Sequence, residues 1–335
     1  MSQLLTATVI SETIASLPRL KVGYSQADAA LLLSQPDTLA VIGFGPRAPA
    51  GSEPNDPRWL RVGLEVVGES ACEVWRGHGP VESGRSGDVR WSSDGDYGFV
   101  AIEVEEAGHA GLCAAAEYAY RALIAFLHAS ATPHVLRLWN YFDAINLGEG
   151  DDERYRRFCV GRARGMADTW QDSYPAATAI GRRDGKRLLQ VYALAARTPG
   201  VAVENPRQVN AWCYPREYGP TPPTFARGMV TPAAQLLISG TAAVVGSASQ
   251  HEDDVAAQLD ETLANLASLI RAARVGPASE LGAGSVLKAY VRDRGDAALL
   301  QERLRSHAPD LDGLLLLEGE ICRRELLTEI DGVHG

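Results

Sequence analysis

The sequence predicts an α/β protein made of two similar halves, each a mixed β-sheet with helices on one face. Three observations support this fold class. Apolar residues make up 46% of the 335 residues, which is enough for a large core. In the last third, strand-like and helical stretches follow in the order β-α-β-α-β-β, and in the middle third strand-like runs again precede a long helix. We expect the halves to span residues 1–196 and 197–335.

The first third of the chain carries short strand-like runs. They are apolar or alternate between apolar and polar residues, and Gly, Pro, Asn and Asp separate them. This pattern is typical of strands joined by turns. The predicted strands lie at 38–45, 60–68, 71–77 and 89–106.

The middle of the chain alternates between helices and strands. A stretch rich in Ala and Leu, with apolar residues at helical spacing, predicts a helix over 112–130. A second helix is expected over 152–170, with Asp151 and Asp152 placed to cap its first turn. Strands are expected at 134–146 and 187–196.

Residues 203–230 differ from the rest of the chain because they are rich in both proline and aromatic residues. No regular helix accepts so many prolines. A solvent-exposed linker is one interpretation, but linkers are usually poor in aromatic residues. We therefore favour an ordered loop that faces a ligand.

The last third has the clearest order of elements. Two helical stretches are amphipathic, and the apolar runs between them read as strands. The predicted helices lie at 251–275 and 298–309, and the predicted strands lie at 235–246, 286–293 and 313–331, the last being a pair.

The charge balance of the chain limits its partners. The formal net charge is −10, which argues against a nucleic-acid partner because such proteins carry a basic field. Only Lys21, Lys186 and Lys288 among the 32 basic residues are lysine, so planar guanidinium groups would hold any anionic ligand. No apolar run is long enough to span a bilayer, so no membrane partner is expected.

The cysteines and the start of the chain predict a reduced protein of the cytoplasm. The five cysteines are widely spaced, without a CxxC pair or a zinc-like cluster, so we expect no metal site. The first twenty residues lack the basic segment and apolar core of a signal peptide. GFGPRAPAG at 43–51 fits a dinucleotide-binding motif poorly, and we expect no cofactor.

Several stretches of the last third resemble one known fold. LLISGTA, QLDETLANLASLI, VLKAYVRD and ELLTEID, within residues 235–331, are similar to the small trimeric imine deaminases of the RidA/YjgF type. The resemblance implies a RidA/YjgF-like fold for the C-terminal half. Leu314 stands where these deaminases carry the arginine that binds the substrate carboxylate, so the resemblance supports the fold and not the deaminase activity.

A longer pattern resembles the chorismatases. It consists of ERYRRFCVGR (153–162), ENPRQVNAWCYPREYGPTPPTFARG (204–228), LLISGTAAVVG (236–246) and EGEICRRELLTEID (318–331). Chorismatases act on chorismate without a cofactor and release pyruvate. The resemblance also implies a divergent N-terminal half paired with a deaminase-like C-terminal half, in a pseudo-trimeric core formed by one or more chains. The oligomeric state, monomer or homo-oligomer, stays open.

The resemblance implies two arginines that bind the two carboxylates of chorismate. Arg162 in FCVGR and Arg227 in FARG stand where the family places its carboxylate ligands. Arginine suits this role because it forms bidentate pairs and stays charged at working pH. Tyr155 lies seven residues before Arg162, on the same face of the expected helix, and Tyr214 precedes Arg227 in the aromatic loop. Their phenol groups can add hydrogen bonds to the same carboxylates.

Glu329 is the residue that we expect to donate a proton. It lies in the alternating strand ELLTEID, where Thr328 and Ile330 point to the opposite face. Burial disfavours the charged form of a carboxyl group and raises its pKa, as a proton donor near neutral pH requires. A glutamate at this place is shared by both resembling families.

Further residues are expected near the substrate. Glycine at Gly240 lets a ligand approach the strand closely, and Thr241 can donate to a ring oxygen. In chorismatases, cysteine at the place of Cys322 goes with the subtype that forms 3-hydroxybenzoate, whereas alanine in the neighbourhood of Ala243 goes with the hydrolase. The remaining expected substrate-binding residues are Ala242, Arg207 and Tyr218.

The resemblance leaves three functions open. The first is conversion of chorismate to 3-hydroxybenzoate, 4-hydroxybenzoate or both, plus pyruvate, for an aromatic secondary metabolite or pigment. The second is hydrolysis of chorismate to 3,4-dihydroxycyclohexa-1,5-diene-1-carboxylate plus pyruvate. The third is a non-catalytic, RidA-like protein that binds a metabolite.

Overall fold

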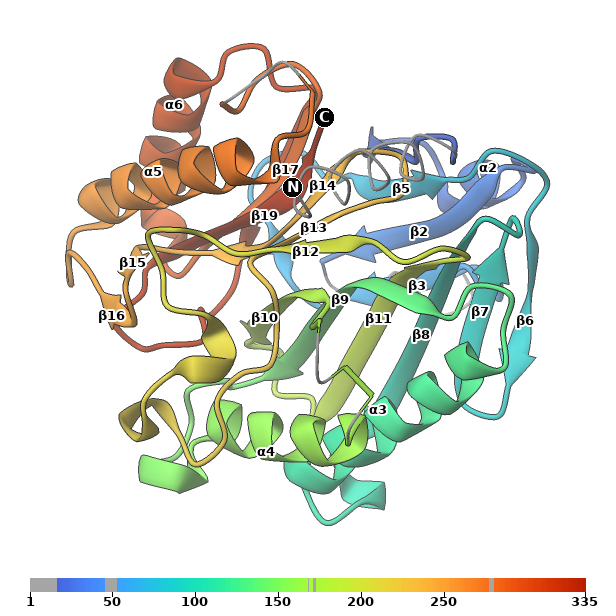
Figure 1. Cartoon of the computed structure of the whole chain (residues 1–335), viewed down its shortest axis with the longest axis horizontal. Coiled ribbons are helices and arrows are strands. Elements are labelled where there is room, and N and C mark those ends of the chain that lie inside the picture. Colours follow the sequence, from blue (N-terminus) through green and yellow to red (C-terminus); the bar gives the residue numbers. More distant parts are fainter. Residues whose placement is uncertain (1–16, 46–52, 168, 171–172, 277–279) are drawn as a thin grey trace, which may run out of the picture.

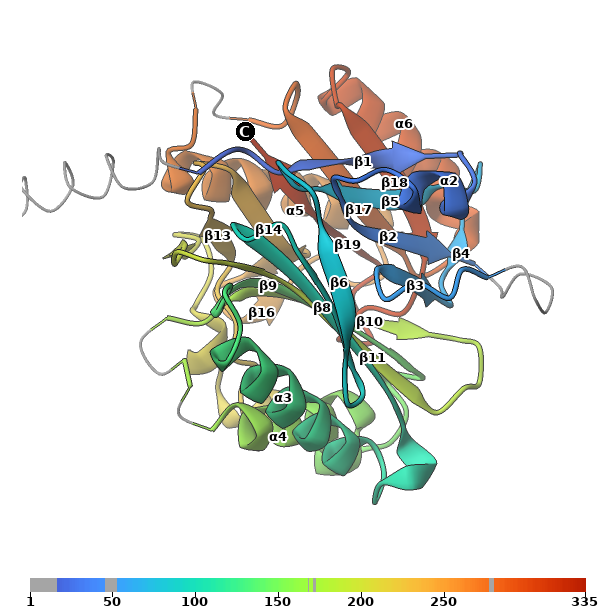
Figure 2. The ribbon, with the colours of Figure 1, turned by 90° about the vertical axis from the view of Figure 1, so that its right-hand side faces the viewer.

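The computed structural model describes residues 17–45, 53–167, 169–170, 173–276 and 280–335. The expectations for the first sixteen residues and for most of the GFGPRAPAG stretch lie outside these ranges. Within them, sheets of four, six and seven strands and one two-stranded ribbon make up the β-structure. The helices α3 and α4 lie on one side of the molecule, and α5 and α6 lie on the opposite side (Figures 1 and 2).

The four-stranded sheet comes from the start of the chain and has the order β1-β5-β2-β3. Its two central strands are β5 and β2, and β2 is the strand predicted at 38–45 and is buried along its whole length. The short helix α2 covers one face of this sheet. The elements are β1 (Lys21–Ser25), α2 (Ala29–Leu33), β2 (Thr38–Phe44), β3 (Trp59–Val62) and β5 (Cys72–Arg76).

The six-stranded sheet has the order β10-β9-β11-β8-β7-β6 and is mixed, because β9 and β10 run parallel. The helices α3 and α4 pack together on its outer face over an apolar layer. The elements are β6 (Glu82–Ser86), β7 (Val89–Ser93), β8 (Tyr97–Glu105), α3 (Leu112–His128), β9 (His134–Asp143), α4 (Arg154–Met166), β10 (Ala176–Arg182) and β11 (Leu188–Ala196).

The seven-stranded sheet has the order β12-β13-β14-β19-β17-β18-β4, with β17 and β18 parallel. The helices α5 and α6 cover its outer face. The elements are β4 (Glu65–Val66), β12 (Val201–Val203), β13 (Gly228–Val230), β14 (Leu236–Thr241), α5 (Val255–Ala273), β17 (Ser285–Val291), α6 (Ala297–His307), β18 (Gly313–Glu318) and β19 (Thr328–His334). The ribbon is β15 (Val244–Val245) and β16 (Ala248–Ser249).

The inner faces of the three large sheets share one core. Apolar residues of all three sheets form a single cluster, whereas separate clusters lie under the outer helices. Side chains along β19 point alternately to the two faces of the sheet. Ile330 packs in the cluster under α5 and α6, and Val333 packs in the central cluster. The same alternation turns Glu329 and Asp331 inward.

The mixed α/β architecture predicted from the sequence is confirmed, with a difference in how the sheets divide. The first 196 residues hold two sheets rather than one, and β4 from this part joins the edge of the C-terminal sheet. Local patterns could not show this, because β4 has only two residues and pairs with β18 far along the chain.

The predicted cap of the second helix is wrong. The residue at the N-cap of α4 is Glu153, and no side chain caps this end. Asp151 instead accepts two hydrogen bonds from Arg216, at 3.0 and 2.6 Å. This exposed pair joins the segment before α4 to the loop that follows β12.

Candidate active site

A pocket of about 450 Å³ opens between the six-stranded and seven-stranded sheets. At this junction β10, the edge strand of the first sheet, lies against β13 and β14 of the second. A deeper recess of about 30 Å³ continues from the pocket. Tyr155, Phe225, Gly240, Cys322 and Glu329 line both spaces, so they form one continuous cavity.

The structure brings most of the predicted site residues to this cavity. They come from α4, from the proline- and aromatic-rich loop, from β14 and its continuation, and from β19 with the segment before it. The nine that line the pocket or its recess are Tyr155, Arg162, Tyr214, Tyr218, Arg227, Gly240, Ala242, Cys322 and Glu329.

Three predicted residues do not line the cavity. Arg207 donates to Asn265 at 2.8 Å and pairs with Glu261 on α5. The hydroxyl of Thr241 donates to the backbone oxygen of Ser239 at 2.9 Å. Ala243 is fully buried in the central core. Each of these side chains therefore has a structural role in the fold.

The carboxyl group of Glu329 lies at the junction of pocket and recess. Its side chain is buried on the inner face of β19, and within the described part of the chain it has no hydrogen-bond partner. Burial raises the pKa of Glu329 to about 8, assisted by the negative charge of Asp331 and opposed by Arg137 and Arg227. At neutral pH the group therefore holds a proton, as a general acid requires.

Arg227 stands in the wall formed by the aromatic loop. Its Nη2 donates to the backbone oxygen of Val209 at 2.8 Å and to the phenol of Tyr214 at 2.6 Å. The guanidinium lies over the rings of Phe225 and Tyr214, at 5.2 and 5.5 Å from their centroids. These contacts fix the charge at the pocket wall.

Arg162 stands at the deep end of the cavity. Its Nη2 donates to the backbone oxygen of Thr224 at 2.8 Å, and its guanidinium lies 5.3 Å from the ring centroid of Tyr120. A guanidinium has five N–H donors, so this bond and the two of Arg227 leave donors for a bound carboxylate. The cavity thus offers two fixed positive charges in different compartments.

Cys322 and Tyr155 form the uncharged part of the recess. Burial raises the pKa of the Cys322 thiol, and Glu329 raises it further when ionised, so the sulfur stays protonated. Burial also raises the pKa of Tyr155 well above 10. Both groups are therefore neutral neighbours of Glu329.

Several residues that line the cavity were not predicted from the sequence. Thr178 and its neighbours belong to β10, whose weakly apolar sequence AATAIGR was not predicted as a strand. Phe225 stands two residues before Arg227 in the motif TFARG, which was the available signal. Arg323 follows Cys322 directly, and its guanidinium lies 3.9 Å from the ring centroid of Tyr218.

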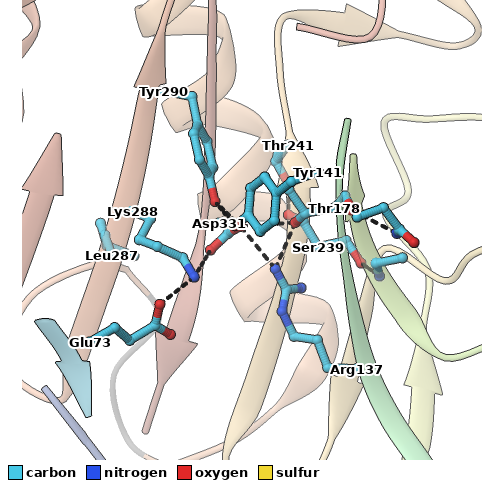
Figure 3. Close-up of polar contacts among 12 residues, drawn as sticks. Glu73, Arg137, Tyr141, Thr178, Ser239, Thr241, Leu287, Lys288, Tyr290 and Asp331 are labelled. Atoms are coloured by element: carbon cyan, nitrogen blue, oxygen red, sulfur yellow. Dashed lines mark hydrogen bonds and ion pairs between the residues drawn. The ribbon is translucent and has the colours of Figure 1, made fainter. Parts of the chain in front are cut away.

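Asp331, two residues after Glu329 on β19, belongs to a buried polar network (Figure 3). Asp331 accepts hydrogen bonds from Thr178 and Tyr290, both at 2.9 Å, and pairs with Arg137 at 3.2 Å. Lys288 pairs with Glu73 at 2.6 Å and lies 3.9 Å from Asp331. The network joins all three sheets.

The described residues offer neither a cluster of metal-binding side chains nor a helix that could span a membrane. Among the described residues, no group of three or more His, Cys, Asp or Glu side chains could hold a metal ion. None of the helices in the described ranges has the length and apolar character needed to cross a bilayer.

Comparisons with known proteins agree with the geometry. The profile of the family described as "Chorismatase FkbO/Hyg5-like, N-terminal" matches residues 73–195. A protein of Streptomyces rapamycinicus named chorismatase is 37% identical in an alignment 283 residues long, and the match covers 79% of this chain and 82% of the relative. A protein of Streptomyces hygroscopicus named 3-hydroxybenzoate synthase is 35% identical, with the same shares covered.

A solved chorismatase structure agrees with these relatives over a longer span. A chorismatase crystal structure superposes with a TM-score of 0.84 and 29% identity, covering 96% of this chain and 99% of the other. The Escherichia coli YjgF structure matches 40% of this chain with a TM-score of 0.30. Because these two relatives are 37% and 35% identical to this chain over 79% of its length, we conclude that the chain belongs to the chorismatase family.

Proposed function

We propose that this protein converts chorismate to 3-hydroxybenzoate and pyruvate. One observation carries the proposal: a buried glutamate that keeps its proton at neutral pH faces a cavity with two fixed arginines. Chorismate carries two carboxylates and an enolpyruvyl ether, whose cleavage begins with protonation of the methylene carbon. The relatives named chorismatase and 3-hydroxybenzoate synthase support the same substrate and product.

The arginines orient the substrate in this proposal. Arg227 binds one carboxylate at the pocket wall, with the phenol of Tyr214 beside it. Arg162 binds the other carboxylate at the deep end. Both guanidinium groups are almost fully buried, so the low-dielectric surroundings strengthen the two ion pairs. The ether then lies between them, near Glu329.

The reaction needs no external oxidant or water. Glu329 gives its proton to the methylene carbon, which becomes the methyl group of pyruvate. The bond between ring carbon 3 and the ether oxygen breaks, and its electron pair completes the carbonyl of pyruvate. The ring 4-hydroxyl oxygen bonds to carbon 3 and releases its proton to Glu329, giving an arene oxide that rearranges to 3-hydroxybenzoate.

Cys322 supports this product over the dihydroxydiene of the hydrolase. Its thiol lines the recess together with Glu329. A neutral thiol is a poor hydrogen-bond partner and does not hold a water molecule against the activated ether. Formation of 4-hydroxybenzoate beside the main product, and hydrolysis, remain alternative outcomes of the product analysis below.

The compartment is part of the proposal. All five cysteines are free, which supports a reducing compartment such as the cytoplasm.

The test measures pyruvate and the aromatic products from purified protein and chorismate. Lactate dehydrogenase coupling follows pyruvate, and chromatography separates 3-hydroxybenzoate, 4-hydroxybenzoate and the dihydroxydiene. We expect pyruvate and 3-hydroxybenzoate in equal amounts. Binding of chorismate without pyruvate would favour the metabolite-binding alternative, and pyruvate with the dihydroxydiene would favour the hydrolase.

A further inference from the structure

We propose that Asp331 is a positioning residue that holds Glu329 in its protonated, proton-donating form. The inference rests on the proposed function of Glu329 as the proton donor. It starts from one feature of β19: two acidic side chains, two residues apart, point into the same buried interior.

The register of the sheet places the two carboxyl groups side by side. Glu329 lies opposite Tyr290 on β17, and Asp331 lies opposite Lys288, so all four side chains share the inner face. Two residues of extended strand separate the Cα atoms of Glu329 and Asp331 by about 6.6 Å. Both side chains are buried on the same face, so two negative charges there would repel each other, and the charge of Asp331 raises the pKa of Glu329.

Hydrogen-bond donors decide which of the two carboxyl groups is ionised. Asp331 accepts hydrogen bonds from Tyr290 and Thr178 and forms an ion pair with Arg137, and Lys288 lies nearby (Figure 3). Within the described residues, Glu329 receives none. Donors stabilise a carboxylate, so the negative charge belongs to Asp331 and the proton to Glu329.

Thr178 lies beside the two carboxyl groups and does not help Glu329 to ionise. Its hydroxyl accepts a hydrogen bond from Arg137 at 2.7 Å and donates to Asp331 at 2.9 Å. The hydroxyl proton of Thr178 therefore points to Asp331 and cannot be donated to Glu329. Thr178 also lines the recess beside Glu329, where it offers oxygen and not a donor.

The charge balance of the network leads to the same assignment. Arg137 pairs with Asp331, and Lys288 pairs with Glu73, so these four buried charges cancel. An ionised Glu329 would add an anion with no partner inside the network.

The groups around Glu329 come from every element packed against it. They are Asp331 on β19, Tyr290 on β17, Arg137 on β9, Tyr155 and Arg162 on α4, Arg227 before β13, and Cys322 before β19. The phenols and the thiol are neutral, and Arg162 and Arg227 face the cavity, where a dianionic substrate neutralises them. Bound substrate therefore reinforces the proton on Glu329.

The test uses Asp331→Asn and reads the proton on Glu329 directly. The Oδ1 atom of Asp331 makes no hydrogen bond within the described residues, so an amide nitrogen can occupy its place. Removing the like charge should lower the pKa of Glu329 by at least about one unit. Infrared titration of the protonated carboxyl band, assigned by its loss in Glu329→Gln, should show this shift in the free enzyme. The pH at which kcat falls on the alkaline side of its profile should decrease by the same amount, and KM should stay nearly unchanged.

Glu73→Gln is the matched control because it removes a buried negative charge from the same network on the far side of Lys288. In this variant we expect the titration midpoint of Glu329 to stay within a few tenths of a pH unit of its value in the parent protein. An unchanged midpoint in Asp331→Asn, or an equal shift in Glu73→Gln, would overturn the proposal.

A measurement on the unmodified protein keeps the proposal testable even if Asp331→Asn does not fold. Protein with ¹³C-labelled glutamate should shift the protonated carboxyl band, and protein with ¹³C-labelled aspartate should not; the reverse result would overturn the proposal. If these infrared results hold but chorismate yields no pyruvate, the proposed function is wrong and the assignment of the proton stands.

Discussion

Gly240 on β14 leaves no room for a side chain beside the carboxyl group of Glu329 on β19. A Cβ atom built on Gly240 would overlap Oε1 of Glu329 and would lie 3.3 Å from the hydroxyl of Thr178. The atom in the way is the end of a flexible side chain rather than backbone. A methyl group here would therefore displace the acid and leave the strands in place.

Gly240→Ala should fold normally and lose activity. Displacing the carboxyl group by about 1 Å removes the alignment needed for proton transfer, so kcat should fall on the order of 10²-fold. Pyruvate release and thermal unfolding measure the two effects. Gly79→Ala is the control, because a Cβ at Gly79 meets no atom within 4 Å. Full activity in Gly240→Ala would show that the reacting group does not need this space.

Glu329→Gln should remove nearly all pyruvate release. General acid catalysis by a positioned side chain contributes roughly 10²–10⁴-fold, and an amide cannot replace it. Retention of more than about a tenth of the activity would assign the proton donor to another residue.

The same substitution should stabilise the fold above pH 5. The pKa of Glu329 rises from 4.5 to about 8 on folding, so between these values the native state binds one proton more than the unfolded state. Stability due to this group is therefore lost as pH rises, and the variant escapes the loss. Urea unfolding at pH 7 should show a gain of about 3 kcal/mol, with little gain at pH 4.5. A gain that is independent of pH would contradict the raised pKa.

Arg162→Ala and Arg227→Ala should weaken chorismate binding. Loss of one charge-assisted contact in a buried site costs about 1.5–3 kcal/mol, which raises KM by about 10- to 150-fold. The lysine variants should lie between, because lysine keeps the charge and loses the planar fork. Arg207→Ala is the control, since Arg207 pairs with Glu261 and does not line the cavity. An unchanged KM would remove that arginine from the site.

Local periodicity predicted the regular elements well. The helix expected over 112–130 is α3 (Leu112–His128), and that expected over 251–275 is α5 (Val255–Ala273). β10 was missed because its residues are small, and its place depends on parallel pairing with β9 rather than on its own pattern. Strands held by distant partners carry little signal in their own sequence.

The cavity could be predicted only in part. Resemblance supplied Glu329, Arg162 and Arg227, but no local pattern showed the network behind the acid. Glu73 and Lys288 are 215 residues apart, and Thr178 and Asp331 are 153 apart. Charged residues in strands usually indicate a solvent-exposed face, and only the packing of three sheets turns these inward.

Cys322→Ala should change the products more than the rate. Formation of 3-hydroxybenzoate requires the ring hydroxyl to attack carbon 3 before water reaches the activated ether. The thiol lines the recess next to Glu329, and burial keeps it neutral, so beside bound substrate it keeps water from this position without donating strongly. Alanine would add the volume of the sulfur atom to a recess of about 30 Å³, which leaves space for a water molecule beside the bound substrate.

We expect this variant to keep appreciable pyruvate release while its products shift toward the dihydroxydiene or 4-hydroxybenzoate. Chromatography of the products at equal pyruvate yield measures the shift. Cys213→Ala is the matched control, because Cys213 is an exposed cysteine that does not line the cavity. If Cys322→Ala and Cys213→Ala give the same product profile as the parent, Cys322 contributes packing alone and the choice between rearrangement and hydrolysis is made elsewhere in the cavity.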